Sequence, residues 1–382
     1  MLRTPLWGIY CLLPFILLRD MGANAWQVAL MIGIKPAVSL FSFYWSAGLE
    51  ERPDRLVSNI IWASVLGSLP FLLFPFVNSV GYFIFAYGAY MLFHRGMIPA
   101  WMELIKRKSS KEKTFAWANL LGYLGDAVFP FLFGPLCDTY EGAWRWIFFA
   151  AALLSIGAVF WQLRIPLQKL EGFALPKPGA IFTKPWKDAW HLMKARADFR
   201  HFQMGFMLGG SGLMVMHATL PYYMMDVLEI SYTELAIALT FCKGVGVGLS
   251  SHFWAAKLQR TSIFPFCAAV TALAAIFPVF LFAAKWQLSS LFAAYLIYGV
   301  MQAGSETAWN LSGPIFAPNE DSSRYSGVNV LTVGIRGVAA PAIATLLFQM
   351  AGSGSVLFLG GSLCLAATGW MLLYTARDVK VV

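Results

Sequence analysis

Long blocks of apolar residues run through almost the whole sequence and limit the folds that this chain can adopt. Each block approaches the roughly 20 residues that an α-helix needs to cross the hydrocarbon layer of a bilayer. Of the 382 residues, 59% are hydrophobic and only 12% are charged, whereas soluble domains carry about 25% charged residues. Since so little polar material cannot cover the surface of a soluble globule, lipid is the expected solvent.

The apolar blocks favour helices over a membrane β-barrel. They are continuously apolar, whereas barrel strands alternate between lipid-facing and lumen-facing residues over about 10 residues. We therefore predict an all-α polytopic membrane protein with twelve transmembrane helices in two pseudo-symmetric six-helix bundles. The expected spans are 3–19, 26–48, 56–77, 79–103, 114–136, 144–163, 201–225, 233–256, 262–284, 288–312, 325–350 and 354–375.

The one long polar stretch divides the chain. It is rich in Lys and Pro and predicts an N-terminal bundle over 1–164, a linker loop over 165–199 and a C-terminal bundle over 200–382. Basic residues are retained on the cytoplasmic side of a membrane. If both termini and the linker are cytoplasmic, the opposite side holds only Arg19, Arg145 and Lys285. We expect an integral protein of a bacterial cytoplasmic (inner) membrane.

Neither the net charge of +9 nor the cysteines indicate a class other than a membrane protein. The basic residues lie between apolar blocks, so they report topology and no nucleic-acid partner is expected. The cysteines lack the spacing of metal ligands, and we expect neither a disulfide framework nor a metal or other cofactor. Cys137 is left open, whereas four are interpreted as small membrane hydrophobes: Cys11, Cys242, Cys267 and Cys364.

The two halves repeat each other. An offset of 208 residues superposes Lys35 on Lys243 and aligns His94 with Gln302, and a nearby offset matches Tyr10 with His217. The same offset of 208 superposes Tyr87, Tyr90, Gly96, Ala100 and Trp101 on Tyr295, Tyr298, Gly304, Ala308 and Trp309. Parallel repeats of six helices, related by an axis along the membrane normal, are typical of the major facilitator superfamily.

Three local motifs also resemble that superfamily. The loop over 47–55 is similar to the family's loop between helices two and three, with Glu51, Arg52 and Arg55 keeping its charges and Asp54 replacing its glycine. The segment Trp144-Arg145-Trp146-Ile147-Phe148 resembles the family's opening of helix six, and a Gly/Pro-rich pattern resembles its helix five: Gly122, Gly125, Pro130 and Gly134.

The resemblance implies a fold and a mechanism. Helices one, four, seven and ten would surround a central cavity, while helix two packs on eleven and helix five on eight. Arg95 falls where proton-coupled antiporters of the family have an arginine, although Ile98 and Pro99 replace the Gln and Gly that should follow. The halves would rock about a site near the midplane of the membrane.

Charges inside the predicted spans are candidates for function, because a charge at the bilayer centre costs several kcal/mol. They are Lys35, Arg95, Asp126, Lys243, Glu306 and Arg336. Asp126 and Lys243 lie at equal depth on helices that the resemblance makes neighbours, which predicts an ion pair. Lys35 and Arg336 share that depth and would repel each other, so an anion between them is expected. The alternative is that such residues form interhelical pairs that only hold the bundle together.

Helix ten carries a polar stripe, because Gln302, Glu306 and Trp309 recur at helical spacing. The predicted substrate-binding residues are Lys35, Arg336, Glu306, Gln302, Trp309, His217, Tyr10 and His94. The predicted coupling or gating residues are Asp126, Lys243, Arg95, Glu51 and Arg52. The two carboxylates inside the predicted spans, Asp126 and Glu306, are candidates for reversible protonation.

These patterns predict a secondary active transporter of a small organic solute, coupled to protons and with a preference for anions. No enzyme constellation or phosphate-binding loop is present in the sequence. The alternatives are a drug or metabolite efflux antiporter of the same fold and a non-transporting membrane sensor. A channel is disfavoured by the scattered charges. The expected partners are the bilayer, the substrate and a proton, and we expect a monomer.

Overall fold

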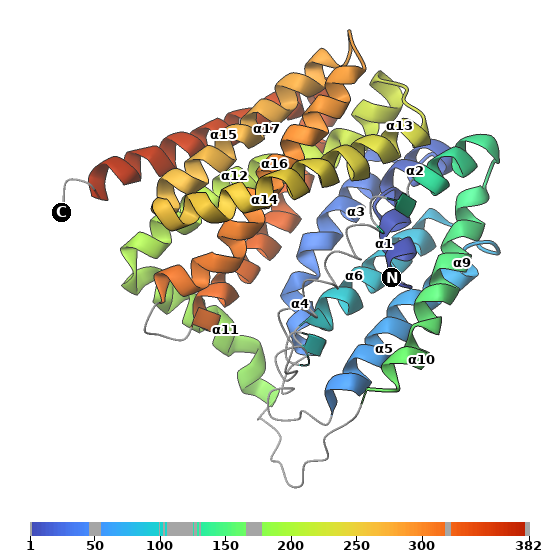
Figure 1. The fold of residues 1–382 in the computed structure, drawn as a ribbon, viewed down its shortest axis with the longest axis horizontal. Helices are drawn as coiled ribbons and strands as arrows, with labels where there is room; N and C mark the ends of the chain where they lie inside the picture. The colour runs from blue at the N-terminus through green and yellow to red at the C-terminus, as the bar shows by residue number, and fades with distance from the viewer. Residues whose placement is uncertain are drawn as a thin grey trace.

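The structure is a computed structural model that describes residues 2–45, 55–98, 100–101, 104, 125, 128–129, 131–165, 178–317 and 322–378. These residues form helices and no strand, as the apolar blocks predict. Figure 1 shows two bundles side by side, the N-terminal half in blue to green and the C-terminal half in yellow-green to red. Helix α11 (Pro178–Ala195) marks one end of the molecule, which we call the linker end; the opposite end is the far end.

The N-terminal helices coincide with the predicted spans. They are α1 (Thr4–Tyr10), α2 (Leu13–Met21), α3 (Ala25–Ala37), α4 (Ser39–Trp45), α5 (Leu56–Ser68), the 3₁₀ helix η2 (Leu69–Leu73), α6 (Val80–Gly96), α9 (Ala143–Gly157) and α10 (Val159–Gln162). The breaks in the first three spans occur near Pro14, Pro36 and Pro70, since proline removes a backbone donor, whereas α9 and α10 separate beside Gly157. Most of the fifth span lies outside the described residues, and its end over 131–139 is helical.

The C-terminal half follows the same plan. Its elements are α12 (Ala197–Tyr222), the π-helix η3 (Tyr223–Val227), α13 (Tyr232–Ala236), the π-helix η4 (Ile237–Cys242), α14 (Lys243–Arg260), α15 (Ile263–Ala283), α16 (Ser289–Phe316) and α17 (Ser322–Asp378). Helix α17 contains the last two predicted spans. Gly352 separates them, because its φ of 75° belongs to a left-handed region that only glycine adopts without strain.

The polar segment between the halves differs from the expected loop in its second part, where α11 (Pro178–Ala195) forms at the linker end. Trp186 and Trp190, spaced by one helical turn, are both exposed on it. The strong amphipathic pattern of this segment explains why a helix forms despite its polar composition.

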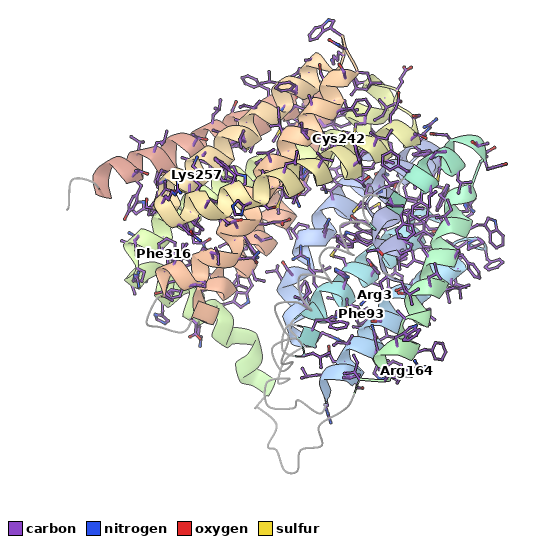
Figure 2. All side chains as sticks on the ribbon, in the orientation of Figure 1. Arg3, Phe93, Arg164, Cys242, Lys257 and Phe316 are labelled. Carbon is purple, nitrogen blue, oxygen red and sulfur yellow. The ribbon has the colours of Figure 1, made fainter. Side chains whose placement is uncertain are left out.

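The chain is an integral membrane protein by the length and composition of its helices. In the described part of the chain, the helices long and apolar enough to span a bilayer are Leu56–Leu73, Ala143–Gln162, Tyr232–Arg260, Ile263–Ala283 and Gly327–Thr375. Each half also has an aromatic core. Phe71, Phe74 and Phe148 pack together in the N-terminal half, as do Phe199, Phe202 and Phe316 in the other, where Figure 2 labels Phe316.

The repeat is visible in how helices approach one another. A methyl group added to Gly96 would come within 2.9 Å of the Trp45 side chain, and one added to Gly304 would come within 2.9 Å of Trp254. Gly96 and Gly304 are the pair that the offset of 208 residues superposes. The same small residue therefore admits the same aromatic ring in each half.

The halves meet along α3 and α17, the helices expected to pack as two on eleven. A methyl group on Gly33 would lie 2.8 Å from the carbonyl oxygen of Gly337, and one on Gly337 would overlap Pro36. Small residues let membrane helices approach until their backbones touch. Because Lys35 precedes Pro36 and Arg336 precedes Gly337, this contact fixes both cations at one level of the interface.

At the far end, hydrogen bonds join the halves. Asp138 Oδ1 accepts from the backbone N–H of Tyr232 at 2.8 Å, and Oδ2 accepts from the N–H and the hydroxyl of Thr233 at 2.9 and 2.6 Å. The Tyr232 hydroxyl donates to Asp20 at 2.7 Å, and Tyr222 donates to the Ala23 carbonyl at 3.0 Å. The N-terminal half thus caps the first turn of α13, which otherwise leaves backbone donors unsatisfied.

Gly134 explains how the cap reaches its helix. A methyl group at this position would lie 2.8 Å from the Cα of Thr233, so only glycine permits the approach. Gly134 belongs to the Gly/Pro pattern of the fifth span, and the expected packing of helix five on helix eight is therefore present at the far end.

We expect Asp138→Ala to loosen the far end. A hydrogen bond to a charged group contributes about 1.5 kcal/mol or more, and 1.4 kcal/mol corresponds to about tenfold in population. Cys11 lines the cavity between the halves. Its modification by a membrane-impermeant thiol reagent, added on the far side, should therefore accelerate about tenfold.

Thr139→Ala is the matched control, since the Thr139 hydroxyl donates to Pro135 of its own helix. The same chain carrying Cys11→Ser gives the background from other cysteines. Equal rates for Asp138→Ala and Thr139→Ala would show that the cap does not hold the halves together.

Candidate functional site

A cavity of about 490 Å³ lies between the two halves. The N-terminal half contributes residues from the α1–α2 region, α3 and α6, and the C-terminal half contributes α12, η4, α14, α16 and α17. The helices expected to surround a central cavity all take part, together with helices two, eight and eleven. The walls thus come from elements that belong to both bundles.

The cavity wall is strongly cationic. Its lining includes Lys35 and Arg95 from the N-terminal half, Lys243 and Arg336 from the C-terminal half, and Glu306 as the carboxylate among the described lining residues. The four cations are half-buried and Glu306 is exposed to the cavity. Positive charges gathered in a site of low dielectric raise its affinity for anions.

The two repeat-related lysines stand at irregular points of their helices. Lys35 is followed by Pro36 inside α3, and Lys243 follows directly on the π-helical turn η4. Such irregular turns are frequent at functional sites because they change the direction of the helix and free backbone groups. The ammonium of Lys35 also lies 5.0 Å from the centre of the Trp7 ring, in cation–π contact.

Arg336 is held against α12. Its Nη1 donates to the carbonyl oxygen of Phe206 at 2.9 Å, and its guanidinium lies 4.8 Å from the centre of the Phe206 ring. A methyl group on Gly210 would overlap the guanidinium, so this glycine makes the position possible. Although a backbone carbonyl anchors it, Arg336 still forms part of the cavity wall.

The stripe predicted on helix ten faces the cavity. Gln302, Glu306 and Trp309 of α16 all line it, joined by Ser305. Gln302 Nε2 donates to Glu306 Oε1 at 2.7 Å and orients the carboxylate. The rings of Trp309 and Phe206 pack with their centres 5.7 Å apart. Since the Phe206 carbonyl also accepts from Arg336, this contact connects the stripe on α16 with Arg336.

Of the two repeat-related residues on helices one and seven, the structure places His217 on the cavity and Tyr10 behind it. Tyr10 is 0% exposed and donates to the Tyr87 carbonyl at 3.2 Å, while its ring stacks on that of Tyr87 at 4.0 Å. The environments nevertheless correspond, because Tyr10 packs on Tyr90 as His217 packs on Tyr298.

His94 also lies behind the wall. Its ring stacks on Trp7 at 4.8 Å and on Tyr90 at 5.6 Å. Unlike its counterpart Gln302, it is not among the residues that line the cavity. His94 therefore packs within an aromatic cluster and not on the cavity wall, which sequence spacing alone does not reveal.

Three predicted residues, Asp126, Glu51 and Arg52, lie outside the described part of the chain. Conversely, Tyr87, Tyr295 and Tyr298 line the cavity without having been predicted as site residues. The signal for them was present, since the offset of 208 residues pairs Tyr87 with Tyr295. Within the described ranges, no three His, Cys, Asp or Glu side chains are placed to hold a metal ion.

Solved structures of transporters share this fold. A mutant of the nucleoside transporter NupG superposes with a TM-score of 0.77 at 12% identity, over 97% of this chain and 96% of that one. A POT family transporter in complex with 5-aminolevulinic acid gives 0.74 at 11%, over 98% and 94%. The human organic anion transporter TETRAN gives 0.64 at 14%, over 97% and 96%. At such identities the likeness concerns the fold alone.

Among proteins of curated function, no sequence matches this chain. The family model of the Major Facilitator Superfamily, in contrast, matches residues 6–341. The match spans both halves and includes every described residue that lines the central cavity. The chain therefore belongs to the Major Facilitator Superfamily and is a membrane transporter of that fold.

Proposed function

We propose that this protein is a secondary active transporter that carries a small organic anion across the membrane by alternating access and couples this movement to protons. One observation carries the proposal. The cavity between the halves presents Lys35, Arg95, Lys243 and Arg336, with Glu306 as the acidic group among its described lining residues. The charges inside the predicted spans favour an anionic solute, and the charges on the cavity wall support the same preference.

The gathered cations need compensation, because positive charges in a site of low dielectric repel one another more strongly than they do in water. Water in an open cavity supplies it while one side is accessible. When the halves close around the site, that water must leave or be held, and a carboxylate or phosphate group takes over its role. A cationic solute would add to the repulsion.

The closed far end supports alternating access. The Asp138 cap and the Tyr232–Asp20 hydrogen bond join the halves there, opposite α11. We place the linker end and both termini in the cytoplasm, because basic residues concentrate on that side, and the protein in a bacterial cytoplasmic membrane as a monomer. The structure would then represent the inward-facing state.

Two other functions are compatible with the same fold, and particular features favour one of them. Arg95 in the cavity wall and the Gly/Pro pattern that contains Gly134 are similar to features of efflux antiporters. A sensor derived from a carrier would keep the fold without transport. Counterflow of a labelled carboxylate into proteoliposomes separates the carriers from a sensor, which gives none. The direction in which an imposed pH gradient drives the solute then separates an efflux antiporter from a symporter.

We expect the double variant Lys35→Gln and Arg336→Gln to lose anion transport. Each charge-assisted hydrogen bond to the solute contributes about 1.5 to 3 kcal/mol, so the apparent affinity should fall at least a hundredfold. The measurement is counterflow of a labelled carboxylate by the purified chain in proteoliposomes.

Lys257→Gln is the control, because Lys257 lies on α14 over the Trp254 ring, away from the cavity lining, where Figure 2 labels it. Thermal unfolding should be alike for all variants. A double variant that still transports the anion with unchanged affinity would refute the role of these cations.

Glu306→Gln should abolish proton-driven accumulation and preserve exchange. Glutamine keeps an oxygen that can accept from Gln302, as Glu306 does at 2.7 Å, so the geometry remains while the titratable group is lost. Accumulation under an imposed pH gradient and exchange without one are measured on the same proteoliposomes. Accumulation equal to that of the unchanged chain would exclude Glu306 as the coupling group.

Asp126 and Lys243 should act as a pair. Lys243 lines the cavity, and Asp126 was predicted at the same depth on the facing helix. We expect Asp126→Asn and Lys243→Gln each to slow transport, and the double variant to be no slower than the worse single one. Strictly additive effects on the logarithm of the rate would show that the two residues are independent.

A further inference from the structure

A second, smaller cavity adjoins the central one inside the C-terminal half. It has a volume of about 190 Å³ and lies between α12, α15, α16 and α17. Met214, His217, Ser305 and Arg336 line both cavities, so the smaller one begins where the central one ends. We call it the side pocket.

The interior of the side pocket is apolar. Leu213, Val270, Met301 and Met371 contribute to its walls. Thr271 is there too, but its hydroxyl bonds to the Cys267 carbonyl at 3.0 Å and to the Thr368 hydroxyl at 2.8 Å. With its hydroxyl engaged, Thr271 turns a methyl group toward the space beside Gly209. A pocket with such walls attracts apolar groups, since water finds few partners in it.

Arg336 marks the boundary between the two cavities. Its guanidinium is fixed over Gly210 and bonded to the Phe206 carbonyl, and Phe206 itself belongs to the side pocket. One face of the guanidinium covers the Phe206 ring, and Arg336 also lines the cationic cavity. A positive group at the mouth of an apolar pocket is complementary to a molecule with an anionic head and an apolar tail.

We infer that the side pocket receives the apolar tail of the transported anion, whose carboxylate or phosphate lies in the central cavity beside Arg336. This inference rests on the proposed function and narrows its substrate to amphipathic organic anions. The size is suitable, because an engineered apolar cavity of about 150 Å³ binds benzene. An aromatic ring or a short branched alkyl group thus fits in the available 190 Å³.

A series of monocarboxylates tests the inference on the purified full chain in proteoliposomes. Acetate, butyrate, hexanoate and 3-phenylpropionate compete with one labelled carboxylate in counterflow. Burial of each methylene contributes about 0.8 kcal/mol, so the apparent affinity should rise roughly fourfold per methylene until the pocket is full. Affinities that do not change with the tail would overturn the inference.

Filling the pocket should remove that gain. Ala274 lines the pocket at the middle of α15, and Ala274→Leu places three more carbon atoms in it. We expect at least a tenfold loss of affinity for 3-phenylpropionate and no change for acetate. Ala275→Leu is the control, because Ala275 is equally part of the buried core and does not line the pocket.

If Ala274→Leu lowers the yield of folded protein, Ala274→Val provides a milder filling with the same expected order of effects. Equal losses for acetate and 3-phenylpropionate would refute the pocket's role while leaving anion transport intact. If none of these carboxylates is transported, the proposed function itself is contradicted, and the inference about the side pocket fails as well. The two failures therefore remain distinguishable.

Discussion

The free-energy cost of placing charge in hydrocarbon governs the arrangement of this molecule. Large apolar side chains such as Leu249 and Phe358, 79% and 72% exposed, cover the outside, where lipid is the solvent. The cations inside the predicted spans all line the central cavity instead. Each escapes the several kcal/mol that a charge costs against lipid. The cavity is therefore required by the sequence as soon as these residues are placed in membrane helices.

Close approach of small residues gives the cavity its shape. Gly33 and Gly337 bring α3 against α17, Gly210 leaves room for Arg336, and Gly134 lets the Asp138 cap reach α13. Apolar side chains gain little by leaving lipid for a protein interior, so contact at short distance supplies the attraction between helices. The glycines thus set the level at which the charged residues meet. Their role here is close packing and not flexibility.

The spans, the repeat and most of the cavity wall could be predicted because each depends on periodicity or on the cost of buried charge. Lys35, Lys243, Glu306 and Arg336 were found in this way. Tyr10 and His217 have corresponding surroundings, but Tyr10 lies behind the cavity wall and His217 on it. The sequence does not predict this difference, because the rotation of a helix about its axis is set by tertiary packing. The side pocket had no sequence signal, because it depends on what helices from distant parts of the chain leave unfilled. The linker helix α11 was missed because its amphipathic pattern was outweighed by its polar composition.

The division of the cations between the halves ties substrate binding to the conformational change. Lys35 and Arg95 belong to one bundle, Lys243 and Arg336 to the other, so their mutual repulsion opposes closure of the halves around an empty site. In the proposed mechanism, an anion bound between the cations replaces their repulsion with attraction, because both bundles are drawn to the anion. A ligand shifts an equilibrium only by its different affinity for the two states. In the proposed mechanism that difference would arise because closure would bring four cations nearer to one anion, while the Asp138 cap at the far end would be given up.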